Sequence, residues 1–200
     1  MRIENKKISD IINNEKLRSR FISIKHNNLN IDCNILKSDF YLDSFNYFPI
    51  LKNFDSFQEI FSWGDANKYE NFYKDSFYKN LINNKKNFDE LSNIFVLGSS
   101  SVDNYYRNLI TFLPRIFFIT NKSIKIAIHR KSSNKFRNLI LKICRKLNVD
   151  VQIIFLDNNF SYFKESLIPQ FFSIKKSVKI LNNINQKNIK PNLKLYIIRK

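Results

Sequence analysis

The sequence is poor in the residues that break or crosslink a chain. Of its 200 residues, 2 are Gly, 4 are Pro and 2 are Cys. This composition excludes collagen-like, glycine-rich and low-complexity linker segments, and no repeat of about 20–50 residues is present. The two cysteines, Cys33 and Cys144, are far apart and lack metal-ligand spacing, which predicts free thiols in a reducing compartment.

Long apolar runs are also lacking. The opening stretch MRIENKKISDIINNEK contains no apolar core of signal-peptide length. The most apolar stretch, LITFLPRIFFI, is interrupted by Arg115 and is shorter than the ~20 residues that a membrane-spanning helix needs. These features predict a cytoplasmic protein, and the basic charge adds the inner membrane surface as an alternative location.

Apolar residues make up 44 % of the chain and aromatic residues 15 %, which indicates a folded core rather than a disordered tail. The net charge is +17 and unevenly distributed: residues 1–100 hold 14 basic and 13 acidic residues, whereas residues 101–200 hold 20 and 4. The abundance of Asn, Lys, Ile and Phe is typical of an AT-rich genome, but codon bias does not explain the asymmetry. A basic half of this kind faces phosphate groups or forms an ordinary solvated surface.

The first ninety residues predict a poorly defined α+β extension (residues 1–90). RFISIKH and NIDCNIL alternate as strands do. Between Lys68 and Ile82, aromatic and apolar residues recur at a spacing of four, which predicts a helix with one packed face.

The remainder, residues 91–200, predicts an α/β fold: a Rossmann-like parallel sheet with flanking helices. Strand patterns (NIFVLG, SIKIAIH, DVQIIFL, SYFKESLIP, NLKLYIIRK) are interleaved with helix patterns that begin after Gly98, at Ser132–Ser133 and near Phe171. Alternation of this kind is typical of strand–helix–strand units. Ligands of such sheets bind at the carboxyl ends of the strands.

The turn after the first of these strands, Gly98 to Ser101, leads into a helix. Its backbone N–H groups are suited to an anion, although ordinary capping by Ser101 or Asp103 explains the same residues. Further along, polar residues at helical spacing predict a single polar face: Asn104, Arg107, Asn108, Thr111 and Arg115. Pro114 should kink or end that helix.

Three segments together resemble a known family. NYYRNLITFLPR, FKESLIPQ and LKLYIIRK occur in the order of similar segments of family 61 glycosyltransferases, which include capsular-polysaccharide enzymes, and they span about Val96 to Lys200. The resemblance implies the N-terminal half of a GT-B fold. It also implies inverting, metal-free transfer of a sugar from a nucleotide-sugar donor, a UDP-sugar, to a glycan or lipid-linked acceptor in polysaccharide biosynthesis, with no permanently bound cofactor.

The resemblance also assigns residues. The substrate-binding positions that it implies are Asn104, Tyr105, Tyr106, Arg115, Tyr196 and Arg199. In this assignment the tyrosines line the acceptor pocket, and Arg199, at a strand end, pairs with the diphosphate.

The chain also departs from the family pattern. The family's histidine, tryptophan, acidic residue and serine are replaced by Arg107, Asn108, Thr111 and Ile198. The catalytic base is therefore unassigned, with Arg107 and His129 as the remaining candidates. The sequence ends within the last segment, before the family's second domain. We therefore expect a truncated or split enzyme, whose missing domain a second chain supplies.

Two other hypotheses remain open. Aromatic and basic residues are interleaved in KFRNLILKICRK, as in a basic nucleic-acid-binding module. The other hypothesis is that the chain is a folded remnant without activity. The sequence shows no metal site, catalytic triad or glycine-rich phosphate loop.

Overall fold

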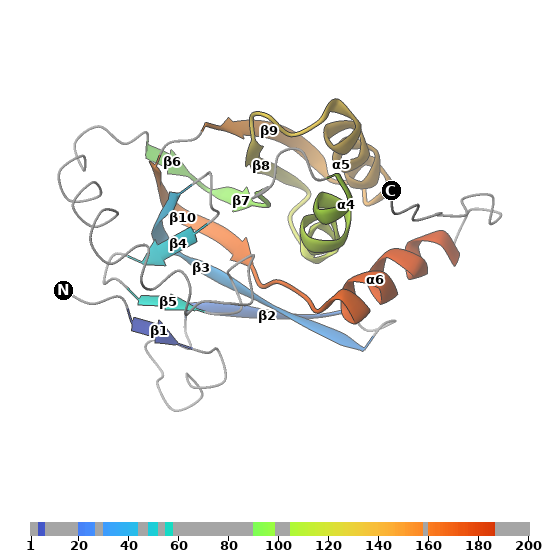
Figure 1. The fold of residues 1–200 in the computed structure, drawn as a ribbon, viewed down its shortest axis with the longest axis horizontal. Helices are drawn as coiled ribbons and strands as arrows, with labels where there is room; N and C mark the ends of the chain where they lie inside the picture. The colour runs from blue at the N-terminus through green and yellow to red at the C-terminus, as the bar shows by residue number, and fades with distance from the viewer. Residues whose placement is uncertain are drawn as a thin grey trace, which may run out of the picture.

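A computed structural model describes the fold of most of the second half of the chain and parts of the first. The described residues are 4–6, 20–26, 30–43, 48–51, 55–57, 90–98, 105–157 and 160–186. Within them, a large sheet carries its helices together at one end of the molecule (Figure 1). A separate pair of short parallel strands joins β1 (Glu4–Lys6) to β5 (Asp55–Phe57).

The large sheet contains eight of the described strands. Six of them lie in the order β2-β3-β10-β7-β8-β9, with β4 beside β3 and β6 beside β10. Their bounds are β2 (Phe21–His26), β3 (Ile31–Asp43), β4 (Phe48–Leu51), β6 (Glu90–Ser92), β7 (Ile94–Val96), β8 (Ser123–His129), β9 (Asp150–Leu156) and β10 (Phe160–Pro169). Strands predicted from both halves of the sequence therefore belong to one sheet.

The predicted mixture of strands and flanking helices is confirmed. β10, β7, β8 and β9 run parallel to one another, and helical segments connect β7 to β8 and β8 to β9. β8 and β9 have the bounds that their apolar patterns predict. The sheet as a whole is mixed rather than parallel, because β3 runs antiparallel to both β10 and β2.

The connection from β9 to β10 differs from a regular strand–helix–strand unit. Only residues 157–159 separate the two strands, too few for a crossover helix. In Figure 1 the strands fan strongly, and the arrow of β9 points toward the start of β10. The right-handed twist of neighbouring strands accumulates in this way across a sheet. β10 then enters between β7 and β3.

The helical segment after β7 changes geometry along its length. It runs through α4 (Tyr105–Arg107), the π-helical η4 (Asn108–Phe112) and the 3-10 helical η5 (Leu113–Phe118). Pro114 explains the change, because it has no N–H and its ring displaces the carbonyl four residues earlier. The backbone N–H of Leu113 reaches back five residues to Asn108 O, and the chain tightens after the proline. Pro114 therefore alters the helix without ending it.

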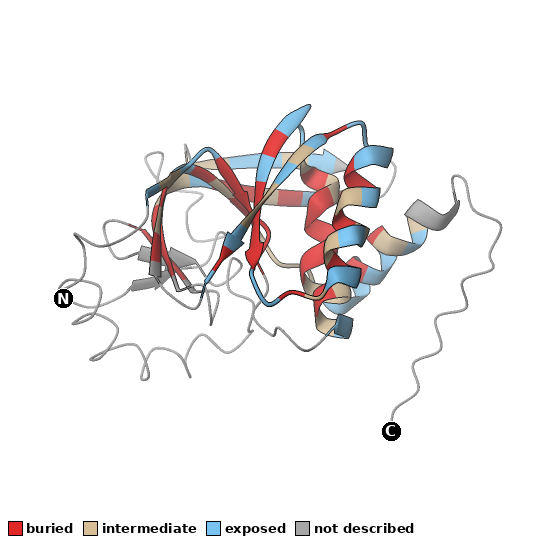
Figure 2. Cartoon of the chain, turned by 90° about the horizontal axis from the view of Figure 1, so that it is seen from above, coloured by how far each residue is buried: buried red, intermediate tan, exposed pale blue. Residues whose placement is uncertain are grey.

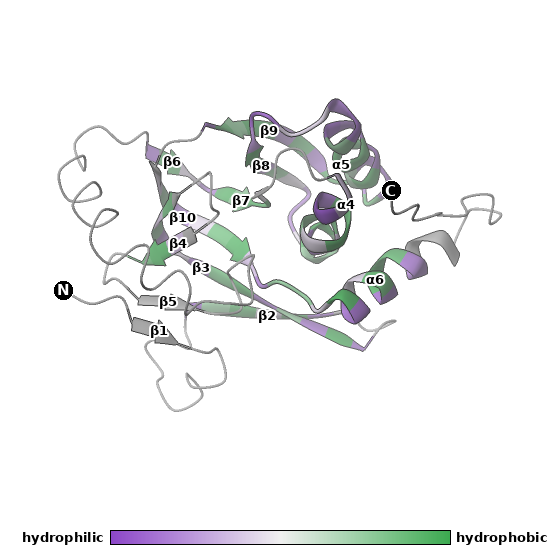
Figure 3. Cartoon of the chain, viewed as in Figure 1, coloured by the Kyte–Doolittle hydropathy of each residue, from purple (hydrophilic) through white to green (hydrophobic). Residues whose placement is uncertain are grey.

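Two regular helices complete the layer, α5 (Asn134–Lys146) and α6 (Ile174–Gln186). Ser133 caps α5 by accepting a hydrogen bond from Phe136 N at 3.2 Å. Both α5 and α6 contact η5. Figure 2 shows buried residues along the inner sides of these helices, and hydrophilic and hydrophobic residues alternate along α6 in Figure 3. Leu147, which follows the last residue of α5, is exposed.

Several predicted elements lie outside the described residues. They are the helix between Lys68 and Ile82, the caps Ser101 and Asp103, and the final strand pattern NLKLYIIRK.

Candidate functional site

Arg115 is the central residue of the carboxyl end of the parallel strands. It lies on η5 and its side chain is 0 % exposed. The guanidinium donates hydrogen bonds to three backbone carbonyls: Leu97 O at 2.8 Å, Val96 O at 3.3 Å and Pro169 O at 2.6 Å. These acceptors belong to the ends of β7 and β10. Arg115 therefore ties two neighbouring strands together where each of them ends.

Aromatic rings enclose the same guanidinium. Its central carbon lies 4.1 Å from the centroid of the Phe171 ring and 5.9 Å from that of Phe112, distances at which a cation is attracted to a ring face. The two rings meet edge to face at 5.4 Å. Planar stacking and several N–H donors suit arginine to this environment better than lysine.

Two members of the predicted polar face are buried: Asn108 and Arg115 are both 0 % exposed. Arg115 follows the π-helical stretch, which adds a residue to the turn and rotates the residues after it. Arg115 therefore points inward.

The other candidates of the same segment lie at the surface. Tyr105 and Tyr106 are 38 % and 45 % exposed, and Arg107 is half-buried. Both phenol rings are accessible to a ligand on this side of the helical layer. Asn104, Tyr196 and Arg199 lie outside the described residues.

His129, the other candidate base, ends β8 and is 1 % exposed. Its Nδ1 accepts a hydrogen bond from the backbone N–H of Lys131 at 3.1 Å. A neutral imidazole that accepts through Nδ1 carries its proton on Nε2. In this arrangement His129 presents a donor, not a lone pair, on its other nitrogen. A role as general base requires this hydrogen bond to break.

The strand register places His129 away from the helices. On β9, Phe155 has Arg137 of α5 4.5 Å above its ring centroid, so Phe155 points to the helical face. Its partner on β8 is Ile128. Because neighbouring residues of a strand point to opposite faces, His129 points to the other face. The structure therefore does not gather Arg115 and His129 on one face of the sheet.

Two exposed basic residues follow His129. Arg130 forms an ion pair with Asp157 through Nε and Oδ1 at 2.5 Å, across the ends of β8 and β9, and its carbonyl accepts from Arg137. Lys131 is exposed. Beside them, the Oγ atom of Ser132 is buried and has no hydrogen-bond partner.

The turn at Gly98 is the predicted anion cradle. Gly98 has a φ of 74°, the left-handed region that glycine adopts readily. Its N–H donates to Ala127 O at 2.9 Å, so this donor is used within the sheet. Any anion site here depends on the following residues, 99–104, which lie outside the described part of the chain.

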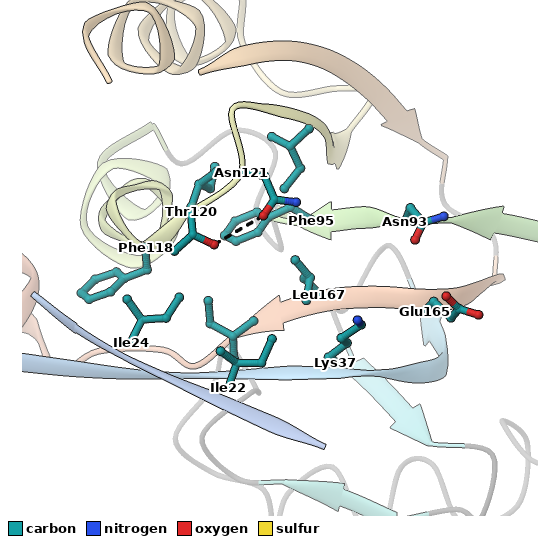
Figure 4. A pocket seen from close by; sticks show the side chains of 13 residues that line it. Ile22, Ile24, Lys37, Asn93, Phe95, Phe118, Thr120, Asn121, Glu165 and Leu167 are labelled. Carbon is teal, nitrogen blue, oxygen red and sulfur yellow. Dashed lines mark hydrogen bonds between the residues drawn. The ribbon is translucent and has the colours of Figure 1, made fainter. Parts of the chain in front are cut away.

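A second site, which sequence reasoning missed, lies at the other end of the parallel strands. A cavity of about 180 Å³ lies over the helical face of the sheet, and the connection between η5 and β8 forms part of its lining. Figure 4 shows the side chains that line it. Residues from β2, β3, β10, β7 and β8 line it. The one signal in the sequence is the break in alternation at FKES, where three consecutive polar residues interrupt the strand pattern.

Neither a metal site nor a membrane span is found in the described residues. They contain no group of three or more His, Cys, Asp or Glu side chains that could hold a metal ion. No helix among them is long and apolar enough to cross a membrane.

Comparisons with known proteins give no relatives. No protein-family model, curated protein or solved structure matches the chain.

Proposed function

We propose that the protein is a glycosyltransferase-related domain, equivalent to the N-terminal half of a GT-B fold. It binds a nucleotide-sugar and a glycan or lipid-linked acceptor at the carboxyl ends of β7 and β8. A second domain or chain faces this edge and completes the inverting, metal-free transfer. A lipid-linked acceptor brings the protein to the inner membrane surface.

One contact carries the proposal. The Arg115 guanidinium donates to Pro169 O at 2.6 Å, across 54 residues of sequence. Arg115 ends the segment NYYRNLITFLPR and Pro169 lies in FKESLIPQ, the first two of the three segments that resemble the family. Segments that build one site are expected to meet in space, and the contact lies at the edge where α/β sheets bind ligands.

The residues around this edge have the chemistry that the proposal needs. Lys131 places an exposed cation at the end of β8, next to the Arg130–Asp157 ion pair, and a cation of this kind binds diphosphates. The exposed rings of Tyr105 and Tyr106 offer stacking surfaces and hydroxyl groups to a sugar acceptor. Arg115 acts as a positioning residue: it fixes the strand ends and does not touch the substrate.

The proposal is tested by measuring ligand-induced stabilisation of the full chain. We expect UDP-sugars at millimolar concentration to raise the melting temperature, and UMP to have a smaller effect. Lys131→Ala should weaken the response about tenfold or less, as expected for one exposed cation on a phosphate. Lys146→Ala, at the opposite end of α5, serves as the matched control. It should leave the stabilisation by UDP-sugars unchanged.

Two outcomes contradict the proposal. In the first, no UDP-sugar or other nucleotide-sugar stabilises the chain. In the second, a polynucleotide binds tightly with an affinity that falls steeply with salt, which indicates phosphate contacts of a nucleic-acid-binding protein. Either outcome would also mean that the resemblance of the three segments to family 61 glycosyltransferases does not indicate function.

A further inference from the structure

The cavity at the amino ends of β7 and β8 has an aliphatic floor. Its floor and wall residues are Ile22, Ile24, Ile35, Phe95, Phe118, Ile119, Ile124 and Leu167. Ile22 is 43 % exposed, and in Figure 4 it lies near Ile24 and Leu167. Cavities of about 150 Å³ take up molecules of the size of benzene. A volume of about 180 Å³ therefore fits a small molecule with an apolar body.

One end of this cavity is polar. Lys37 of β3, Glu165 of β10 and Asn93, which precedes β7, line it. Lys37 and Glu165 are both exposed. Among the ion pairs of the described residues, neither side chain takes part in one. The lining of the cavity thus includes both a cation and an anion.

Two of these polar residues have a left-handed backbone. Asn93 has a φ of 56° and Glu165 a φ of 47°. Asn adopts this region readily, whereas for a residue such as Glu it costs about 1–2 kcal/mol. Asn93, between β6 and β7, lies beside the Glu165 stretch of β10, since Asn93 N donates to Lys164 O at 3.1 Å. Strained residues that gather around a cavity are typical of ligand sites.

A β-bulge explains the conformation of Glu165. Between Phe163 and Ser166, three steps of β10 lie opposite two steps of β3, so one residue is extra. The Asp39 carboxylate fixes the bulge: it accepts from Glu165 N at 2.9 Å and from the Tyr162 hydroxyl at 3.0 Å. An extra residue moves all later side chains of the strand to the opposite face.

The bulge therefore creates the cavity wall. Leu167 pairs with Lys37 and shares its face of the sheet. Without the extra residue, Ser166 would take this position and Leu167 would point away. The same feature thus supplies an apolar side chain to the floor and a carboxylate to the polar end.

We propose that this cavity binds a free aliphatic α-amino acid such as L-leucine. The branched side chain contacts the isoleucine and leucine floor, the carboxylate pairs with Lys37, and the ammonium pairs with Glu165. A fatty carboxylate meets Glu165 with like charge, and an alkylamine meets Lys37 with like charge. A zwitterion satisfies both groups.

The test measures binding of L-leucine to the full chain by calorimetry. Two matched analogues each lack one charge: isocaproate has no ammonium and isoamylamine has no carboxylate. We expect each to bind at least about tenfold more weakly than L-leucine, a difference of about 1.4 kcal/mol. Glycine, which keeps both charges but lacks the side chain, should also bind more weakly.

Variants locate the site. Lys37→Met and Glu165→Gln should each reduce the affinity for L-leucine about tenfold. Lys164→Met is the matched control, because Lys164 precedes Glu165 but pairs with Glu90 at 3.7 Å and does not line the cavity. It should bind L-leucine like the parent.

Three results overturn the proposal. L-leucine does not bind at millimolar concentration, an analogue that lacks one charge binds as tightly as L-leucine, or Lys164→Met loses as much affinity for L-leucine as Lys37→Met and Glu165→Gln. The outcome is independent of the glycosyltransferase proposal, because the cavity and the Arg115 edge lie at opposite ends of the parallel strands.

Discussion

The two ends of the parallel strands are built in opposite ways. At the carboxyl ends, Arg115 is fully buried, donates to three carbonyls and is enclosed by aromatic rings. At the amino ends, Lys37 and Glu165 border a cavity, and the backbone at Glu165 is strained. At the carboxyl ends the charged side chain is fully packed. At the amino ends the charged side chains are exposed, and Glu165 has a backbone conformation that its own side chain disfavours.

This contrast distinguishes residues that stabilise the fold from residues that are available to bind a ligand. A fully buried arginine whose terminal nitrogens donate to backbone carbonyls fixes the strand ends and is a poor ligand contact. We therefore expect substrate at the carboxyl end to contact exposed neighbours such as Tyr106 and Lys131. Backbone strain at Glu165, in contrast, is of the kind that is retained at ligand-binding sites.

The largest expected effect tests the support role. Arg115→Met removes the donors of three buried carbonyls, and each buried acceptor left without a donor costs about 1–3 kcal/mol. We therefore expect a loss of ~3 kcal/mol or more in the free energy of unfolding, measured by urea denaturation. Lys142→Met, on the exposed side of α5, is the control and should change stability by less than about 0.5 kcal/mol.

Arg115→Lys sharpens this test. It keeps the positive charge but not the planar fork, so it should recover only part of the lost stability. If Arg115→Met is as stable as the parent, the strand ends are held by other contacts, and the contrast between the two ends disappears.

A smaller effect of opposite sign is expected at the amino end. Glu165→Gly removes the side chain that opposes a left-handed backbone, so it should stabilise the protein by about 1 kcal/mol. Asn93→Gly should change stability by only a few tenths of a kcal/mol, because Asn tolerates this conformation. Both values come from urea denaturation. Destabilisation by Glu165→Gly would show that the carboxylate contributes to the fold and is not reserved for a ligand.

The smallest effect at neutral pH concerns Cys33, which is near both regions. Burial raises the pKa of its thiol from 9.0 to about 12, and the nearby Arg115 charge opposes this shift. Because the unfolded thiol ionises at lower pH than the folded one, the stabilising contribution is complete below pH 9 and is lost between pH 9 and about pH 12.

The check compares the parent with Cys33→Ala at several pH values. The difference in unfolding free energy between the two proteins should be constant from pH 7 to 8.5 and should shrink above pH 9, as the parent loses this contribution. A constant difference up to pH 11 would mean that the Cys33 thiol ionises equally in both states.

Much of the helical and parallel part could be predicted from the sequence, because its patterns are local. The alternation in SIKIAIH and DVQIIFL and the serine before α5 define elements through neighbouring residues. The position of β10 could not be predicted in this way, since pairing with β3 depends on contacts more than 120 residues apart, such as Tyr162 with Asp39.

The candidate site residues also divide into those that a local pattern identifies and those that depend on distant contacts. Arg115 was identified from a segment, but its buried position follows from a π-helical turn that no propensity scale predicts. The cavity was missed because its polar end combines residues from three separate parts of the chain, and because the bulge at Glu165 depends on a distant carboxylate.

The central position of β10 has a consequence for how the chain is made. β3 leaves the ribosome about 120 residues before the strand that covers its long edge, as the separation of 123 residues between Asp39 and Tyr162 shows. Until β10 arrives, Phe40 lacks the Phe163 ring on which it stacks at 5.1 Å. Pairing over such distances slows folding and leaves strand edges open to aggregation. Synthesis of the first half alone should therefore produce a chain that needs a chaperone.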